Sequence, residues 1–162
     1  MESYTWCELD SPVGKLLAVR SDRGLVRVVF EREGFAEELA KLSGEQREAL
    51  DAEAAAQFAG YFAGARKEFT LPLDWSLTGG FREEVQRAML GIPYGSTVSY
   101  GELARHLGHP GANRAVGTGC ARNPLPIVVP CHRVTRSGGA PGNYLAGPDV
   151  KKHLLNLEAA HA

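Results

Sequence analysis

Cysteine is scarce in this chain: the 162 residues contain three, Cys7, Cys120 and Cys131. An odd number of widely spaced cysteines argues against a disulfide framework. There is no CxxC pair, and the five histidines show no ligand spacing with the cysteines, so we expect no metal site. Residues 1–75 contain Cys7 and no histidine, which leaves no ligand set for a structural zinc there. We also expect no cofactor.

Long hydrophobic runs are missing as well. No apolar segment approaches the roughly 20 residues that a membrane-spanning helix needs. The first six residues lack the basic segment followed by an apolar one that marks a signal peptide. We therefore expect a cytoplasmic protein, associated with the nucleoid if its source is bacterial, that does not bind membranes.

The chain has almost no net charge, −1 in total, but its two halves differ. Residues 1–75 carry a net charge of −5 and residues 76–162 a net charge of +4, and all five histidines lie in the second half. A basic half on a nearly neutral chain fits contact with a polyanion such as a nucleic acid. A chance distribution of so few charges explains the asymmetry equally well.

The length and the 44% hydrophobic content fit a globular protein of two small domains. We expect residues 1–75 to form the first, with strands in an antiparallel meander and helices, and residues 76–162 the second. Apolar alternation and helical spacing both contribute to this prediction. The expected elements of the first domain are strands at 3–9, 15–20, 25–30 and 67–73 and helices at 35–42 and 45–63. The face of the longer helix expected in the core comprises Leu50, Ala54, Phe58, Tyr61 and Phe62.

The second domain reads as mainly helical. After a linker at 74–80, in which Thr78 is a candidate helix cap, helical spacing predicts helices at 81–90, 99–107 and 112–121. A glycine-containing turn joins the last two helices, which is the helix-turn-helix pattern.

The expected helix at 112–121 carries two glycines, Gly117 and Gly119, and one long cation near its start, Arg114. Glycine in a helix interior costs roughly 1 kcal/mol relative to alanine, and it permits close approach of another surface. That surface is either a DNA groove or the protein's own core, and the sequence favours neither.

The segment Pro130-Cys131-His132-Arg133 follows an apolar run at 126–129. A thiol is a strong nucleophile only as thiolate, and a neighbouring base or cation promotes that form. An imidazole beside a thiol at the end of an apolar run therefore indicates a positioned nucleophile.

Several motifs in a fixed order resemble the O6-alkylguanine-DNA alkyltransferases, also called methylated-DNA–protein-cysteine methyltransferases. The similarity is strong over residues 81–158 and extends to residues 1–75 only as a coarse pattern of strands and helices. It implies an α/β fold with a ribonuclease H-like first domain and a winged-helix-like second domain. The motifs are Ser99-Tyr100, Arg114-Ala115-Val116-Gly117, Asn123-Pro124-x-Pro126-Ile127, Pro130-Cys131-His132-Arg133-Val134, Gly142-Asn143-Tyr144 and Lys151-x-x-Leu154-Leu155-x-x-Glu158.

The resemblance implies that Cys131 takes the alkyl group from O6-alkylguanine in DNA, with O4-alkylthymine as a possible second substrate, and keeps it. His132 would act as base through a bound water and Glu158 would orient the imidazole; read without the family, Glu158 is a solvated carboxylate at a helix end. Tyr100 would give a proton to the leaving guanine. Asn123 would brace the active-site turn, although an Asn before Pro is also a common local turn former.

The resemblance also implies that the damaged base is flipped out of double-stranded DNA, approached through the minor groove, while Arg114 fills the vacancy. We expect a monomer, with cooperative binding to DNA left open. The methyl group of Ala146 is expected to narrow the base pocket against bulky adducts. The residues expected to contact DNA are Arg114, Ala115, Gly117, Thr118, Tyr94 and Arg133. Those expected to line the pocket are Val129, Pro130, Ser137, Gly138, Tyr144, Leu145 and Ala146.

Two other functions compete with this one. A sensor that binds alkylated DNA without chemistry is the first, and the presence of Cys131 argues against it. The second is a winged-helix transcription regulator, in which Cys131 would be structural or redox-sensing. Only an alkyl acceptor predicts stoichiometric label on Cys131 after exposure to methylated DNA.

Overall fold

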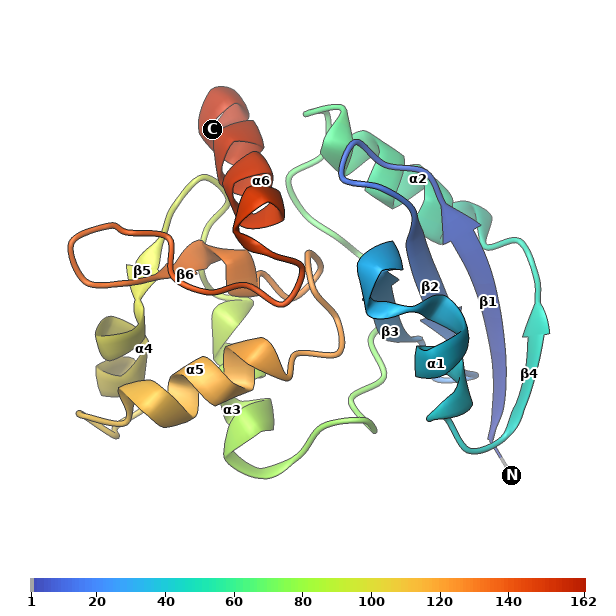
Figure 1. The fold of residues 1–162 in the computed structure, drawn as a ribbon, viewed down its shortest axis with the longest axis horizontal. Helices are drawn as coiled ribbons and strands as arrows, with labels where there is room; N and C mark the ends of the chain where they lie inside the picture. The colour runs from blue at the N-terminus through green and yellow to red at the C-terminus, as the bar shows by residue number, and fades with distance from the viewer. Residues whose placement is uncertain (1) are drawn as a thin grey trace. The chain divides into compact units, whose positions relative to one another are not determined.

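The computed structural model describes residues 2–162, which divide into two compact units, one ending at Leu77 and the other spanning Thr78–Ala162 (Figure 1). The first unit is built on a four-stranded sheet and the second is mainly helical, so the expected α/β fold class is confirmed.

The sheet of the first unit has the strand order β3-β2-β1-β4. β1 and β2 pair antiparallel, as do β2 and β3, which is the predicted meander. Leu16, Leu17, Ala18 and Val19 are all buried, so both faces of β2 are covered. The strands are β1 Ser3–Leu9, β2 Leu16–Arg20, β3 Leu25–Phe30 and β4 Glu45–Glu48. The helices η1 Glu31–Glu33 and α1 Phe35–Ala40 lie between β3 and β4, and α2 Ala52–Phe62 follows β4.

The sequence predicted one helix over residues 45–63, and this prediction is wrong. Glu45–Glu48 is the strand β4, which pairs parallel with β1, and the helix begins after Asp51, whose carboxylate accepts a hydrogen bond from the backbone N–H of Ala54. Leu50 lies before this cap and is 85% exposed, so its expected place in the core is also wrong. Glu45–Glu48 carries no apolar residue that would mark a strand, and its pairing with β1 decides the outcome.

No strand forms at 67–73 either. Leu73 makes one isolated bridge with Leu25, where the N–H of Leu25 donates to Pro72 O at 2.8 Å. Pro72 has no N–H of its own to continue a ladder.

The second unit contains the predicted helix-turn-helix, formed by α4 Tyr100–His106 and α5 Asn113–Ala121. A capping box between Ser99 and Glu102 starts α4. Gly79, not Thr78, is the N-cap of α3, and no side chain caps that helix. The other elements are α3 Gly80–Met89, β5 Val98–Ser99, η2 Cys131–Arg133, β6 Val134–Thr135 and α6 Pro148–His161, with β5 and β6 pairing parallel.

The two glycines of α5 serve different surfaces. A Cβ at Gly119 would lie 2.9 Å from Val85 of α3, so Gly119 allows α5 to pack against the unit's own core. The side chain of Gln86, also on α3, donates to Gly119 O at 3.0 Å. A Cβ at Gly117 would meet nothing within 4 Å. Gly119 thus supports the packing of α5 against the unit's own core, whereas Gly117 faces open space.

Candidate functional site

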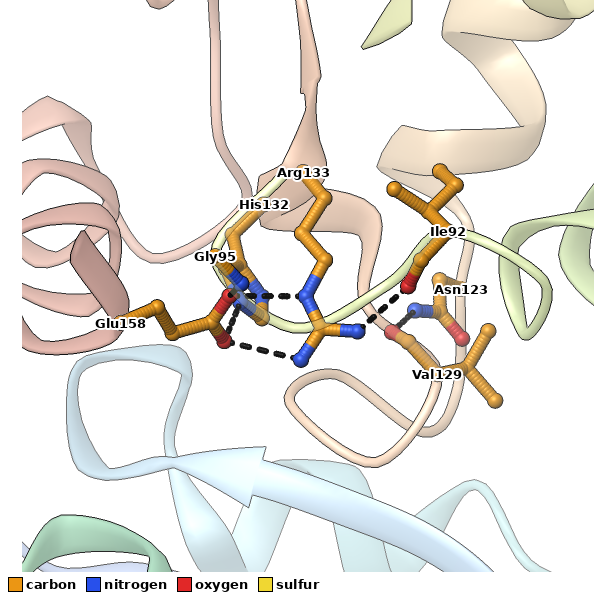
Figure 2. Close-up of polar contacts among 7 residues, drawn as sticks. All are labelled: Ile92, Gly95, Asn123, Val129, His132, Arg133 and Glu158. Carbon is orange, nitrogen blue, oxygen red and sulfur yellow. Dashed lines mark hydrogen bonds and ion pairs between the residues drawn. The ribbon is translucent and has the colours of Figure 1, made fainter. Parts of the chain in front are cut away.

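A tight turn before η2 positions the cysteine. The side chain of Asn123 donates to Val129 O at 2.9 Å and accepts from the N–H of Leu125 at 3.0 Å, so one buried amide ties both ends of the turn (Figure 2). Ile127 within the turn has φ 75°, a conformation that is strained for a β-branched residue. The N–H of Cys131 then donates to Val129 O at 2.8 Å. Asn123 thus holds a strained segment whose end carries the thiol.

Cys131 is 2% exposed, and burial raises the pKa of its thiol to about 11. Hydrogen bonding by Asn123, the positive charge of Lys151 and hydrogen bonding by Tyr144 act in the opposite direction on this pKa. The resting thiol is therefore protonated at neutral pH, and its use as a nucleophile requires that a base take the proton.

A buried ion cluster lies next to the thiol in sequence. The Glu158 carboxylate receives His132 Nε2 at 2.6 Å, Arg133 Nε at 2.8 Å and the second Arg133 nitrogen at 3.0 Å, and it accepts the N–H of Gly95 at 3.2 Å (Figure 2). Arg133 also donates to Ile92 O at 2.7 Å. The side chains of His132 and Glu158 are 0% and 1% exposed, so Glu158 is not a solvated carboxylate.

The carboxylate fixes the state of the imidazole. With Nε2 donating to Glu158, the proton of neutral His132 lies on Nε2 and the lone pair on Nδ1. Burial lowers the pKa of His132, against the raising effect of Glu158, so the ring is neutral at neutral pH. Nδ1 is buried and has no hydrogen-bond partner among residues 2–162. His132 thus presents an unused basic nitrogen.

A cavity of about 620 Å³ opens beside the thiol. Cys131 and Tyr100 both line it, which brings a thiol and a phenol to one space. The remaining lining residues come from α4, α5 and the segment between β6 and α6: Gly101, Asn113, Arg114, Gly117, Thr118, Cys120, Ala121, Arg136, Ser137, Asn143, Tyr144 and Leu145.

The free face of α5 borders this cavity. Arg114, Ala115 and Thr118 are exposed, whereas Val116, Gly119 and Cys120 are buried. Arg114 and Thr118 also line the cavity. An exposed arginine, on a face that carries otherwise small side chains, thus borders the cavity that Cys131 lines.

Two family models match the chain. Residues 4–75 match the ribonuclease-like domain of 6-O-methylguanine DNA methyltransferase, and residues 80–160 match the DNA binding domain of the same proteins. The chain belongs to the 6-O-methylguanine DNA methyltransferase family. Its activity is therefore transfer of a methyl group from methylated DNA to a cysteine of the protein, a direct repair of DNA. The resemblance inferred from the motifs is confirmed.

Curated relatives and solved structures agree with this membership. A methylated-DNA–protein-cysteine methyltransferase of Methanosarcina acetivorans is 40% identical over 93% of this chain and 96% of that protein. The constitutive enzyme of Bacillus subtilis is 38% identical over 98% and 96%. The Mycobacterium tuberculosis O6-methylguanine methyltransferase structure has a TM-score of 0.85 at 37% identity, covering 100% and 95%. A structure of the protein from that organism in complex with DNA has a TM-score of 0.82 at 36% identity, covering 99% and 94%.

Within this family fold, one residue expected to contact DNA lies elsewhere. Arg133 is 7% exposed and its guanidinium is held by Glu158 and Ile92 O, so its assignment to DNA is wrong. Its partner lies 25 residues away in the sequence, which the local motif did not reveal. The Arg133 guanidinium lies 5.6 Å from the ring centroid of Tyr94, whose hydroxyl is buried, and Tyr94 thus belongs to the same cluster.

The pocket also differs from the expected list. Ser137, Tyr144 and Leu145 line it, whereas Val129, Pro130, Gly138 and Ala146 do not. Ala146 is 0% exposed, so its methyl group packs inside the protein, and the apolar side chain at the cavity wall is that of the preceding Leu145. Neighbouring side chains of this irregular segment thus differ in their surroundings: Leu145 lines the cavity and Ala146 is buried in the protein.

Sequence reasoning assigned no role to Lys151, which the structure places at the site. Its Nζ donates to Val134 O at 2.6 Å and to Asn143 O at 3.3 Å, and lies 5.8 Å from the ring centroid of Tyr100. Burial lowers the pKa of this ammonium group. The spacing of Lys151 with Leu154 and Glu158 on α6 was the available signal, because it places all three on the buried face.

The remaining findings concern metals and membranes. No group of three or more metal-ligating side chains of His, Cys, Asp or Glu occurs among residues 2–162. In the same part of the chain, no helix has the length and apolar character needed to cross a bilayer.

Proposed function

We propose that Cys131 is the residue that accepts the alkyl group, in a single turnover, from O6-alkylguanine in double-stranded DNA, with O4-alkylthymine as a second substrate. The arrangement of a buried thiol at a cavity, beside a neutral imidazole with a free lone pair, carries this proposal. The thioether product has no proton to lose and no leaving group to expel, so each molecule acts once.

The reaction balances with the residues at hand. The Cys131 sulfur forms a bond to the alkyl carbon while the bond between that carbon and guanine O6 breaks. The thiol proton passes to His132 Nδ1 through a water molecule, and Glu158 stabilises the imidazolium that results. The departing guanine takes a proton from Tyr100, which the imidazolium proton later replaces through solvent. Because the pKa of the thiol is about 11, proton removal during attack is required.

We further propose that the damaged base enters the cavity by flipping, at a cost of a few kcal/mol. Arg114 supports this role, since it is exposed on α5 and lines the cavity. The Arg114 side chain would enter from the minor groove and fill the place that the flipped base leaves in the base stack. Ala115, Gly117 and Thr118 would lie against the DNA backbone. The protein would act as a monomer in the cytoplasm.

The intact mass of the protein before and after exposure to a duplex with O6-methylguanine tests the proposal. We expect one added CH₂ unit per molecule, abolished by Cys131→Ser and retained by Cys120→Ser. Cys120 is the matched control because its buried thiol lines the same cavity. An unmodified protein that still binds the duplex would instead indicate a damage sensor. A mass increase that persists in Cys131→Ser would exclude Cys131 as the acceptor.

A further inference from the structure

Arg136 is an unused cation at the edge of the cavity. It follows β6, lines the cavity and is exposed. Its guanidinium makes no hydrogen bond or ion pair with another residue in the range 2–162, whereas Arg133, three positions earlier, is fully engaged by Glu158 and Ile92 O. Nothing in the sequence-based assignment of site residues gave Arg136 a role.

The backbone around Arg136 is fixed by a turn. The N–H of Arg136 donates to Ala140 O at 2.8 Å, and the N–H of Gly139 donates to Arg136 O at 3.0 Å. This turn directs the residue to the cavity without restraining its guanidinium. The backbone of Arg136 is therefore fixed, while the five N–H donors of its guanidinium stay available.

The stem of Arg136 lies close to the phenol of Tyr100. The position that a Cβ would occupy at Gly142 is 3.1 Å from Tyr100 Oη and 3.5 Å from Arg136 Cγ, so both side chains converge on this glycine. Gly142 has φ +78°, which favours glycine there for a second reason. The proton donor proposed for the leaving base and the stem of Arg136 thus lie at the same side of the cavity.

We propose that Arg136 binds a phosphodiester oxygen of the nucleotide whose base enters the cavity. This inference rests on the proposed function, because it assumes that a flipped nucleotide reaches Cys131. The exposed Arg136 guanidinium has no anionic partner among residues 2–162, and the phosphates of a DNA backbone accept paired N–H donors of arginine. Arg114, on α5, lines the same cavity. Arg114 would then replace the base while Arg136 holds its backbone outside the stack.

The first test compares Arg136→Gln with Arg82→Gln. Arg82 is exposed on α3 and outside the cavity lining, so its substitution removes one charge from the same unit without touching the site. For a methylated duplex below saturation, we expect Arg136→Gln to slow transfer about tenfold, the effect of one lost hydrogen bond to a charged group. Transfer from free O6-methylguanine base should stay within twofold of wild type. Arg82→Gln should leave both rates unchanged.

Salt dependence gives a second measurement. In a Cys131→Ser background, which cannot react, the slope of log affinity against log salt for the methylated duplex should fall by about 0.9 with Arg136→Gln, as for one released counterion. Arg136→Lys should restore the slope, because the positive charge returns, while restoring only part of the affinity.

A neutral methylphosphonate at single positions around the lesion identifies the phosphate. At one position the methylphosphonate should slow transfer by the wild type about tenfold. It should not slow transfer by Arg136→Gln further, because the methylphosphonate and the Arg136 substitution remove the same contact. If Arg136→Gln slowed transfer equally on the duplex and on the free base, the proposal would be overturned, because Arg136 would then act on Tyr100 and not on a phosphate. Unchanged transfer on the duplex would overturn it as well. Label on Cys131 of the wild type reports the proposed function separately.

Discussion

Replacing Glu158 with glutamine separates the role of its charge in folding from its role in transfer. The carboxylate is 1% exposed and faces the Arg133 side chain, which is 9% exposed, at 2.8 Å. Removal of one partner from a buried ion pair leaves the other charge uncompensated and costs about 3–5 kcal/mol. We therefore expect Glu158→Gln to lower the free energy of unfolding by about 3 kcal/mol, measured by chemical denaturation.

The double variant Arg133→Met/Glu158→Gln tests the origin of that loss. It removes both charges and leaves an amide oxygen for His132 and for the N–H of Gly95, so it should recover most of the stability. Transfer, in contrast, should fall about 100-fold in both the single and the double variant, because neither can stabilise the imidazolium with a negative charge. Glu84→Gln, at an exposed position on α3, should change neither quantity.

Two results would refute this reasoning. A double variant as unstable as the single one would show that the uncompensated Arg133 charge is not the source of the loss. Transfer by Glu158→Gln at the wild-type rate, at a temperature where the variant is folded, would remove Glu158 from the chemistry.

Four further outcomes are expected. The transfer rate should be constant near neutral pH and fall on acidification through the lowered pKa of His132, below 6.5, since protonation occupies the base; a rate that rises on acidification would contradict this. Tyr100→Phe should slow transfer about tenfold with unchanged affinity in gel-shift titrations, unless Tyr100 gives no proton. Arg114→Ala should slow transfer from duplex DNA more than from the free base, and equal losses would show that it does not assist flipping. Leu145→Ala should raise the rate with O6-benzylguanine relative to O6-methylguanine, because its side chain and not that of Ala146 lines the cavity; an unchanged ratio would contradict that assignment.

Elements with strong local signals were predictable from the sequence. The apolar alternation of residues 3–30 identified three strands, and the helical spacing of Leu103, Ala104 and Leu107 located α4. The strand Glu45–Glu48 was not predictable in the same way, because it carries no apolar alternation and exists through its pairing with Ser3–Trp6. Local patterns thus fail where a distant partner selects the structure.

The site shows the same division. The thiol and its neighbouring imidazole were evident from the order of motifs, whereas the pairing of Arg133 with Glu158 spans 25 residues and appears only in the fold. Charged residues are usually solvated, so a buried arginine and a buried lysine contradict the default expectation for each. The Lys151 ammonium group and one nitrogen of Arg133 donate to backbone carbonyls, which sequence spacing does not encode.

Burial of Cys131 changes the view of how its reactivity is controlled. The sequence suggested a thiol activated by its neighbour, but burial raises the pKa of that thiol to about 11 and the adjacent imidazole is neutral, so the resting thiol keeps its proton. Oxidants and stray electrophiles attack exposed thiolates fastest. A protein that uses its cysteine once would lose its function through any such reaction. A protonated thiol that gives up its proton only during attack on a carbon held in the cavity avoids that loss, and the unused lone pair of His132 supplies the base when it is needed.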